Sequence, residues 1–222
     1  MDAGEVLGWP FRDPRWPARI LGMGAIWLLL SLTIVGAIPA LIALNGWMLQ
    51  CLDNLRGGRL ELARPGLPLR RGARLFLVQL VYLAVIVAVT TLLTAAGVQA
   101  AKAGGPAAIG GGLLVILANA LSLLGSLALV VLLPEIALLI ERRGLPGGFA
   151  LPAILRMARS AGSTAILTGL LSLLALDIIS PLGLLLCLVG VAATTPYAMA
   201  VLAAAIHGLE ELEGESHVSA AG

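Results

Sequence analysis

Long apolar stretches between tight clusters of arginine constrain this chain more than any other feature. The three clusters are Arg12, Arg15 and Arg19; Arg56, Arg59, Arg64, Arg70, Arg71 and Arg74; and Arg142, Arg143, Arg156 and Arg159. A helix needs about 20 apolar residues to cross the hydrocarbon core of a bilayer, and most of the intervening stretches reach that length. Loops rich in arginine and lysine stay on the cytoplasmic side. The pattern therefore predicts a multi-pass membrane protein.

Composition supports the same interpretation. Of the 222 residues, 59% are hydrophobic and 12% are charged, too little polar surface for a soluble domain of this size. Without a soluble basic domain, a nucleic-acid partner is not expected. Cys51 and Cys187 lie in or at the end of apolar spans and form neither a disulfide framework nor a zinc site. A signal peptide ending near residues 35–37 would be unusually long, so an uncleaved first helix is preferred.

We expect an all-α fold, a polytopic transmembrane helix bundle at residues 20–208, with an interfacial segment at 1–19 and a disordered acidic tail at 209–222. Six spans are predicted, at about 20–36, 39–55, 75–98, 109–140, 161–179 and 182–207.

The first apolar block, Ile20 to Leu52, decides the topology. As a hairpin turning at Gly36 to Pro39, it gives six spans, places every arginine on one face with only Lys102 on the other, and makes both termini cytoplasmic. As one kinked span, it gives five. Charge asymmetry favours the hairpin. Against it, the pattern from Ser31 to Leu44 recurs from Ser126 to Leu139, and an internal duplication would place the prolines of both copies at one depth.

Local signals predict how the chain enters the first span. Asp13 before Pro14 forms an N-cap and N1 pair that begins a helix. Trp9, Phe11 and Trp16 suit an aromatic belt at headgroup level.

Several short motifs carry a family resemblance over residues 10–208. They are Phe11-x-Asp13-Pro14-x-Trp16, Asn45-Gly46-Trp47, the basic segment Leu55-Arg56-Gly57-Gly58, Leu67-Pro68 ahead of Arg70, and the ending Pro196-Tyr197 through His207-Gly208. Together they resemble domain-of-unknown-function family 4013, a family of prokaryotic polytopic membrane proteins. Trp47 departs from the family's usual tyrosine, and Leu69 from its usual acidic or aromatic residue. The resemblance implies a multi-pass bundle in a prokaryotic cytoplasmic membrane, and supplies no reaction or catalytic residue.

Candidate sites are contact surfaces. The expected contacts with lipid headgroups or a partner are Arg56, Arg59, Arg70, Arg71, Arg74, Arg142 and Arg143. The expected helix-packing residues are Asn119, Ser122, Ser126, Ala200 and Ala204, because small residues spaced by four let helices approach closely. His207 with Glu210 and Glu211 has helical spacing but lacks further metal ligands. Glu135 and Asp177 are the acidic residues nearest the membrane interior, and both are expected at an interface.

From these features we predict a non-enzymatic structural, accessory or regulatory component of the bacterial cytoplasmic (inner) membrane. No catalytic residue, cofactor or metal is assigned. Its expected partners are membrane lipids and a membrane protein or second copy. The alternative is a transporter or channel for a small or lipidic solute, for which the Gly36–Pro39 break is the only pointer; an enzyme acting on lipid is the weakest hypothesis.

Overall fold

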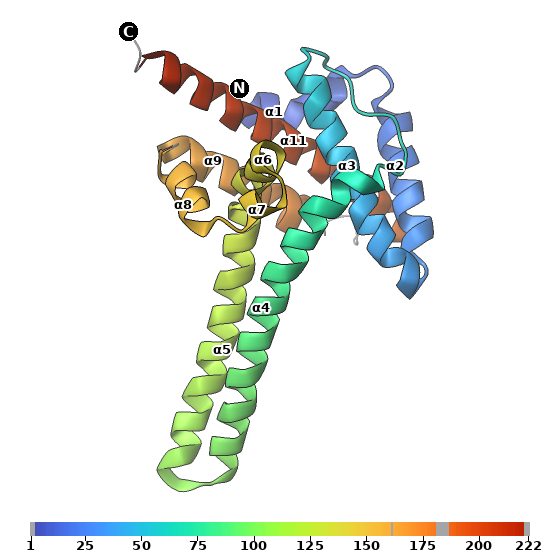
Figure 1. Ribbon diagram of the computed structural model, residues 1–222. Coiled ribbons are helices and arrows are strands. Elements are labelled where there is room, and N and C mark those ends of the chain that lie inside the picture. Colours follow the sequence, from blue (N-terminus) through green and yellow to red (C-terminus); the bar gives the residue numbers. More distant parts are fainter. Residues whose placement is uncertain (1–2, 161, 181–186, 220–222) are drawn as a thin grey trace. The chain divides into compact units, whose positions relative to one another are not determined.

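The protein is described by a computed structural model that covers residues 3–160, 162–180 and 187–219 (Figure 1). All regular elements in these ranges are helical, which confirms the all-α prediction there. The elements are α1 (Ala3–Gly8), η1 (Trp9–Arg12), α2 (Trp16–Ser31), α3 (Ile34–Arg56), α4 (Leu69–Lys102), α5 (Gly105–Val131), α6 (Leu133–Arg143), α7 (Leu145–Gly148), α8 (Leu151–Ser160), α9 (Gly162–Leu173), η2 (Leu174–Ile179) and α11 (Cys187–Ser219).

The chain divides into two compact units. Unit 1 comprises Met1–Phe76 and Val131–Gly222, and unit 2 comprises Leu77–Val130. Helix α4 begins in unit 1 and continues into unit 2. Unit 1 holds most of the buried side chains, whereas unit 2 is a helical hairpin whose side chains are mostly exposed.

In unit 1, α2 and α3 form the predicted hairpin, but the turn lies earlier than expected. Helix α2 ends at Ser31, and the Thr33 side chain caps α3 by accepting a hydrogen bond from the Gly36 backbone N–H at 3.0 Å. Pro39 lies inside α3. The predicted turn at Gly36–Pro39 is therefore wrong, because a threonine N-cap outcompetes the Gly and Pro signals. Pro39 is the sixth residue of α3, so its missing N–H removes one helical hydrogen bond, the one to the Val35 carbonyl.

Helix α11 crosses the centre of unit 1 and packs against α2, α3, α6 and α9. Its alanines allow this close approach: Ala200, Ala203 and Ala204 are fully buried. Trp9 is also fully buried and donates its indole N–H to the Ala200 carbonyl at 3.0 Å. Trp9 is thus a core residue rather than part of an aromatic belt, while Phe11 is exposed and stacks edge-on against Trp16.

The predicted span at 109–140 is two helices. Helix α5 ends at Val131, and α6 begins at Leu133 with Pro134 in its first turn. Proline lacks the N–H that would continue the α5 ladder and favours a new helix start. Eight residues of α6 are buried in unit 1, from Leu133 to Ile140, so this segment belongs to the core.

The last predicted spans are only partly described. Of the span predicted at 161–179, residue 161 lies outside the described part, and the rest forms α9 and the π-helix η2, with Leu167–Ile179 a short apolar helix. Residues 182–186 of the span predicted at 182–207 lie outside the described part, as do residues 220–222 of the tail. Helix α11 runs to Ser219, so the tail expected to be disordered from residue 209 is helical as far as that point. Glutamate and leucine favour helix there.

Unit 2 consists of the α4 segment from Leu77 and of α5, which lie side by side and antiparallel (Figure 1). Gly97 and Gly111 allow this approach, since a Cβ at Gly97 would lie 2.7 Å from the Gly111 carbonyl oxygen. Large apolar side chains point away from the pair; Leu92 is 71% exposed and Ile116 66%. Helices that are apolar on all sides are typical of a lipid environment.

By length and composition, four of the described helical segments can cross a membrane. They are Val35–Arg56, Leu69–Lys102, Gly105–Val131 and Gly190–Glu211. Trp16–Ser31 and Leu167–Ile179 are shorter apolar helices. Membrane-length helices are thus present in the described chain, and the count of six spans stays a prediction.

Candidate functional site

A buried carboxylate organises the start of α2. Asp13 is 1% exposed and forms an ion pair with Arg19 at 3.0 Å. It also accepts hydrogen bonds from the backbone N–H groups of Arg15, at 2.8 Å, and Leu62, at 3.0 Å. The helix begins at Trp16 with Arg15 as N-cap, so the prediction that Asp13 and Pro14 open it is wrong. Asp13 instead joins this end of α2 to the loop between α3 and α4.

The same loop, residues 57–68, is held along its length. Arg19 donates to the Leu62 carbonyl and to the Glu61 carboxylate, the latter at 2.9 Å. From α3, the Asn54 side chain donates to the Glu61 carbonyl at 2.9 Å, and the Trp47 indole donates to the Ala63 carbonyl at 3.1 Å. A non-helical connection of this length is uncommon and is often functional. Here side chains from α2 and α3 fix its backbone.

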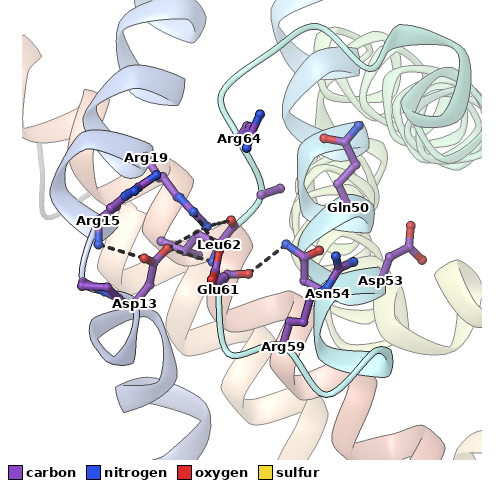
Figure 2. A pocket seen from close by; sticks show the side chains of 12 residues that line it. Asp13, Arg15, Arg19, Gln50, Asp53, Asn54, Arg59, Glu61, Leu62 and Arg64 are labelled. Atoms are coloured by element: carbon purple, nitrogen blue, oxygen red, sulfur yellow. Dashed lines mark hydrogen bonds and ion pairs between the residues drawn. The ribbon is translucent and has the colours of Figure 1, made fainter.

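These contacts surround a polar pocket of about 740 Å³ (Figure 2). The start of α2 and the end of α3 form opposite sides, and the loop lies between them. The lining residues are Asp13, Pro14, Arg15, Arg19, Gln50, Asp53, Asn54, Arg59, Glu61, Leu62, Ala63 and Arg64. The volume falls within the range usual for small-molecule sites, about 300–1,000 Å³. Of the predicted contact residues, only Arg59 lines this pocket.

A second group of charges links four helices of unit 1. Arg71 of α4 bridges Asp53 of α3 and Glu141 of α6. Arg56 binds Glu210 of α11 through its Nε at 2.8 Å and lies 3.4 Å from Asp53. Arg56 and Arg71 therefore have protein partners. These ion pairs bring together residues of α3, α4, α6 and α11 that lie far apart in sequence.

The remaining predicted arginines lie on the surface. Arg70 and Arg74 are exposed in the first turns of α4, and Arg142 and Arg143 are exposed in the last turn of α6. Their contact with lipid or a partner stays a prediction. Arg142 and Arg143 follow Glu141, the carboxylate that binds Arg71, so they lie close to the charged network.

In unit 2, Asn119 and Ser122 line a groove of about 340 Å³ between α4 and α5. Thr90, Thr91, Thr94, Ala95 and Ala118 complete its lining. The Thr90 hydroxyl donates to the Ile86 carbonyl at 2.9 Å, and the Asn119 amide nitrogen donates to the Val115 carbonyl at 2.8 Å.

The other predicted packing residues lie outside this groove. Ser126 is exposed further along α5, while Ala200 and Ala204 are buried within unit 1. The two small-residue stripes thus have different surroundings.

The acidic and histidine candidates do not gather at one site. His207 lies 3.3 Å from Glu211, while Glu210 binds Arg56. Glu135 is buried at the start of α6, and Asp177 is exposed in η2. Among the residues the structure describes, no three metal-ligand side chains lie close enough together to hold an ion.

Sequence reasoning missed several lining residues. Arg15 and Arg64 lie far apart in the chain but line one pocket, because the Leu62 N–H of the loop binds Asp13 beside α2. No local sequence pattern indicates that contact. The sequence could have indicated the three threonines of the groove. Thr94 follows Thr91 by three residues and Thr90 by four, and residues at these spacings share one face of a helix.

The helical architecture and the exposed apolar hairpin define an all-helical membrane protein. A family model described as "Protein of unknown function (DUF4013)" matches residues 29–189, more than half of the chain. The chain belongs to this family, which confirms the resemblance. The motifs at 45–47, 55–58 and 67–68 lie inside the matched range, whereas those at 11–16 and 196–208 lie outside it. No curated protein and no solved structure matched the chain.

The glycine of the Asn45-Gly46-Trp47 motif has a structural role. A Cβ at Gly46 would lie 2.9 Å from the Pro68 side chain, and one at Gly72 would lie 2.6 Å from the Gly46 backbone nitrogen. Gly46, Pro68 and Gly72 therefore allow α3 and the start of α4 to pack closely. The Leu67-Pro68 and Asn45-Gly46-Trp47 motifs are two sides of one contact.

Proposed function

We propose that this protein is a non-enzymatic accessory component of a membrane that binds a transmembrane helix of another protein along its α4–α5 hairpin. The observation that carries the proposal is the polar groove in unit 2. It lies on a hairpin whose other side chains are mainly apolar and exposed, including Val89, Leu92 and Leu123.

Several polar side-chain groups in the groove are free to form further hydrogen bonds. The hydroxyls of Thr91, Thr94 and Ser122 form no hydrogen bond with another described residue, and the Asn119 carbonyl oxygen is likewise available. In hydrocarbon, polar side chains stabilise helix association by bonding across the interface, and small residues such as Ala118 let the backbones approach. Each such bond contributes about 0.6 to 2 kcal/mol in membranes. A partner helix with polar residues at matching depth would satisfy this surface.

A photo-crosslinking amino acid at position 119 tests the proposal in native membranes. We expect one reproducible protein adduct, which Thr91→Val and Thr94→Val together should reduce. Leu124 provides the control, because it is exposed and lies on a different face of α5 at 3.6 residues per turn. Adducts with lipid alone at position 119, or equal protein adducts from both positions, would count against the proposal.

The alternative function, a transporter or channel for a small or lipidic solute, rests on the same groove, because its polar lining could contact a solute. Reconstituted vesicles would then show a solute flux that Asn119→Leu changes. No flux across a broad solute panel, with a partner adduct retained, would favour the accessory role.

We further propose six spans in the bacterial cytoplasmic membrane, with both termini on the cytoplasmic side. The hairpin of α2 and α3 supports this topology, because it returns the chain to the side where α2 begins. In a variant with Cys51→Ala and Cys187→Ala, a cysteine at Ala3 should react only from the cytoplasm and one at Ala103 only from outside. Labelling of both from the same side would contradict this topology.

A further inference from the structure

The pocket between α2, α3 and the 57–68 loop carries an excess of positive charge. Four of its lining residues are arginines, Arg15, Arg19, Arg59 and Arg64, and three are carboxylates, Asp13, Asp53 and Glu61. The carboxylates already have protein partners. Arg19 binds Asp13 at 3.0 Å and Glu61 at 2.9 Å, and Asp53 is bound by Arg71 and Arg56.

The other three arginines have no such partner. The side chains of Arg15, Arg59 and Arg64 form no ion pair or hydrogen bond with any residue in the described part of the chain, and all three are exposed. They come from three different positions: the N-cap of α2, the turn after α3, and the middle of the loop. The Asp13 and Asn54 contacts join α2, the loop and α3, so the three arginines line one pocket whose backbone is held in place (Figure 2).

We propose that this pocket binds a phosphate-bearing anion through Arg15, Arg59 and Arg64. Guanidinium groups match phosphate oxygens in a two-bond geometry and are less strongly hydrated than an ammonium group. Gln50 adds a neutral amide to the lining, and the space of about 740 Å³ accommodates a ligand larger than a single phosphate group. The site lies in unit 1, so the proposal is independent of partner binding by the α4–α5 hairpin.

Two sources could supply this chemistry, and both are phosphate esters. One is the headgroup of an anionic lipid, because the pocket lies beside the ends of apolar helices α2 and α3. The other is a soluble phosphate ester. Phosphatidylglycerol is a phosphodiester and glycerol 3-phosphate is a phosphomonoester. Both present a phosphate group bound to glycerol, and only the lipid carries acyl chains.

The experiment uses the full-length protein in a neutral detergent. Binding of phosphatidylglycerol is titrated by native mass spectrometry, with zwitterionic phosphatidylcholine for comparison, and binding of glycerol 3-phosphate by calorimetry. We expect tighter binding of phosphatidylglycerol than of phosphatidylcholine if a lipid occupies the site, and binding of glycerol 3-phosphate if the ligand is soluble. In the variant R15Q/R59Q/R64Q, affinity for the bound probe should fall by about tenfold or more. Hydrogen bonds that involve charged groups contribute more free energy than those between neutral groups, and the variant loses three charged donors.

The control removes the same charge elsewhere. K102Q/R156Q/R159Q alters three exposed basic residues, none of which lines the pocket. Its affinity should stay within about twofold of the original protein, because exposed charges act weakly through solvent. Both variants should unfold at the same temperature as the original protein without ligand, since neither set forms an ion pair with a residue that the structure describes.

The result that overturns the proposal is equally specific. Equal losses of affinity in the two variants would show general attraction to a basic surface, and failure of the original protein to bind either anionic probe would remove the site altogether. A tenfold loss confined to the pocket variant supports it, and the probe affected identifies the source.

Discussion

At the scale of single residues, Asp13 has the most consequential position. Its carboxylate is nearly inaccessible to solvent but has three partners in three parts of the chain. These are the Arg15 N–H in the turn before α2, the Arg19 guanidinium in α2, and the Leu62 N–H in the loop. Burying a charge costs free energy unless it is paired and hydrogen-bonded. Asp13 meets that condition, so its removal should affect the fold and the pocket together.

We therefore expect Asp13→Ala to lower the free energy of unfolding by about 2–3 kcal/mol, because a buried N–H and the Arg19 guanidinium lose a charged acceptor. Thermal unfolding in detergent measures the change. Glu61→Gln is the matched control: Glu61 also binds Arg19, but its side chain is 59% exposed, so a loss under about 1 kcal/mol is expected. Equal losses in both variants would show that Asp13 acts as an ordinary surface charge.

The Thr33 cap gives a second residue-level prediction. Thr33→Val keeps the shape of the side chain but removes the acceptor for the Gly36 N–H, and should cost about 1 kcal/mol in unfolding free energy. Thr33→Ser retains the acceptor and should unfold near the temperature of the original protein. A valine variant as stable as the serine variant would mean that the turn does not depend on this cap.

At the scale of elements, close contacts between glycines decide which helices can pair. Gly111 and Gly112 are neighbours in α5 but have opposite surroundings. A Cβ at Gly111 would lie 2.5 Å from the backbone nitrogen of Ala101, whereas one at Gly112 would meet nothing within 4 Å. The contact in unit 2 is therefore specific to one face of the helix.

Gly111→Val should force α4 and α5 apart near their connection and destabilise the hairpin by about 1–3 kcal/mol, as overpacked contacts do. Gly112→Val introduces the same side chain without a clash and should be neutral or slightly stabilising, since valine has a better helix propensity than glycine. The two variants are compared by resistance to heat-induced aggregation in detergent. A reversed ranking of the two variants, or equal resistance to aggregation, would contradict the close contact between α4 and α5 at Gly111.

Sequence patterns predicted the existence of these elements better than their ends. Span length and the positions of arginine indicate the helices at 39–55 and 75–98, because both signals are local and repeat along the chain. The turn at Leu32–Thr33 was misplaced, and the break at Leu132 was not predicted. Gly36 and Pro39 looked like a turn but are accommodated in the first turns of α3, while Pro134 marks a helix start inside what looked like one apolar span.

At the scale of the whole molecule, ion pairs join helices that are distant in sequence. Arg71 is the central residue, since it binds carboxylates from both α3 and α6. The predicted set of contact arginines therefore has two roles. Arg56 and Arg71 hold the helices of unit 1 together, whereas Arg59 forms no ion pair with a residue that the structure describes and lines the pocket with Arg15 and Arg64, which were not in that set. Charge clustering alone could not separate these roles, because the acidic partners Glu141 and Glu210 lie 70 or more residues away.

Arg71→Gln should lower the free energy of unfolding by about 1–2 kcal/mol, a value reduced for partial exposure to solvent, with the effect diminishing as salt is added. Arg70→Gln, one residue earlier and without an ion pair in the described structure, should change stability by under about 0.5 kcal/mol. Chemical unfolding in low and high salt measures both. A salt-independent effect of Arg71→Gln would contradict an electrostatic origin.

The tip of the α4–α5 hairpin has a consequence for how the chain is made. Lys102 is the only charged residue between Arg74 and Glu135, and it lies beside Gly104 and Gly105, which both have positive φ. A hairpin that inserts tip-first during biosynthesis carries a single ammonium group through the hydrocarbon, a transfer that insertion measurements place at about 3 kcal/mol. The apolar side chains of α4 and α5, whose membrane-length segments have mean hydropathies of 2.5 and 2.4, compensate for that cost.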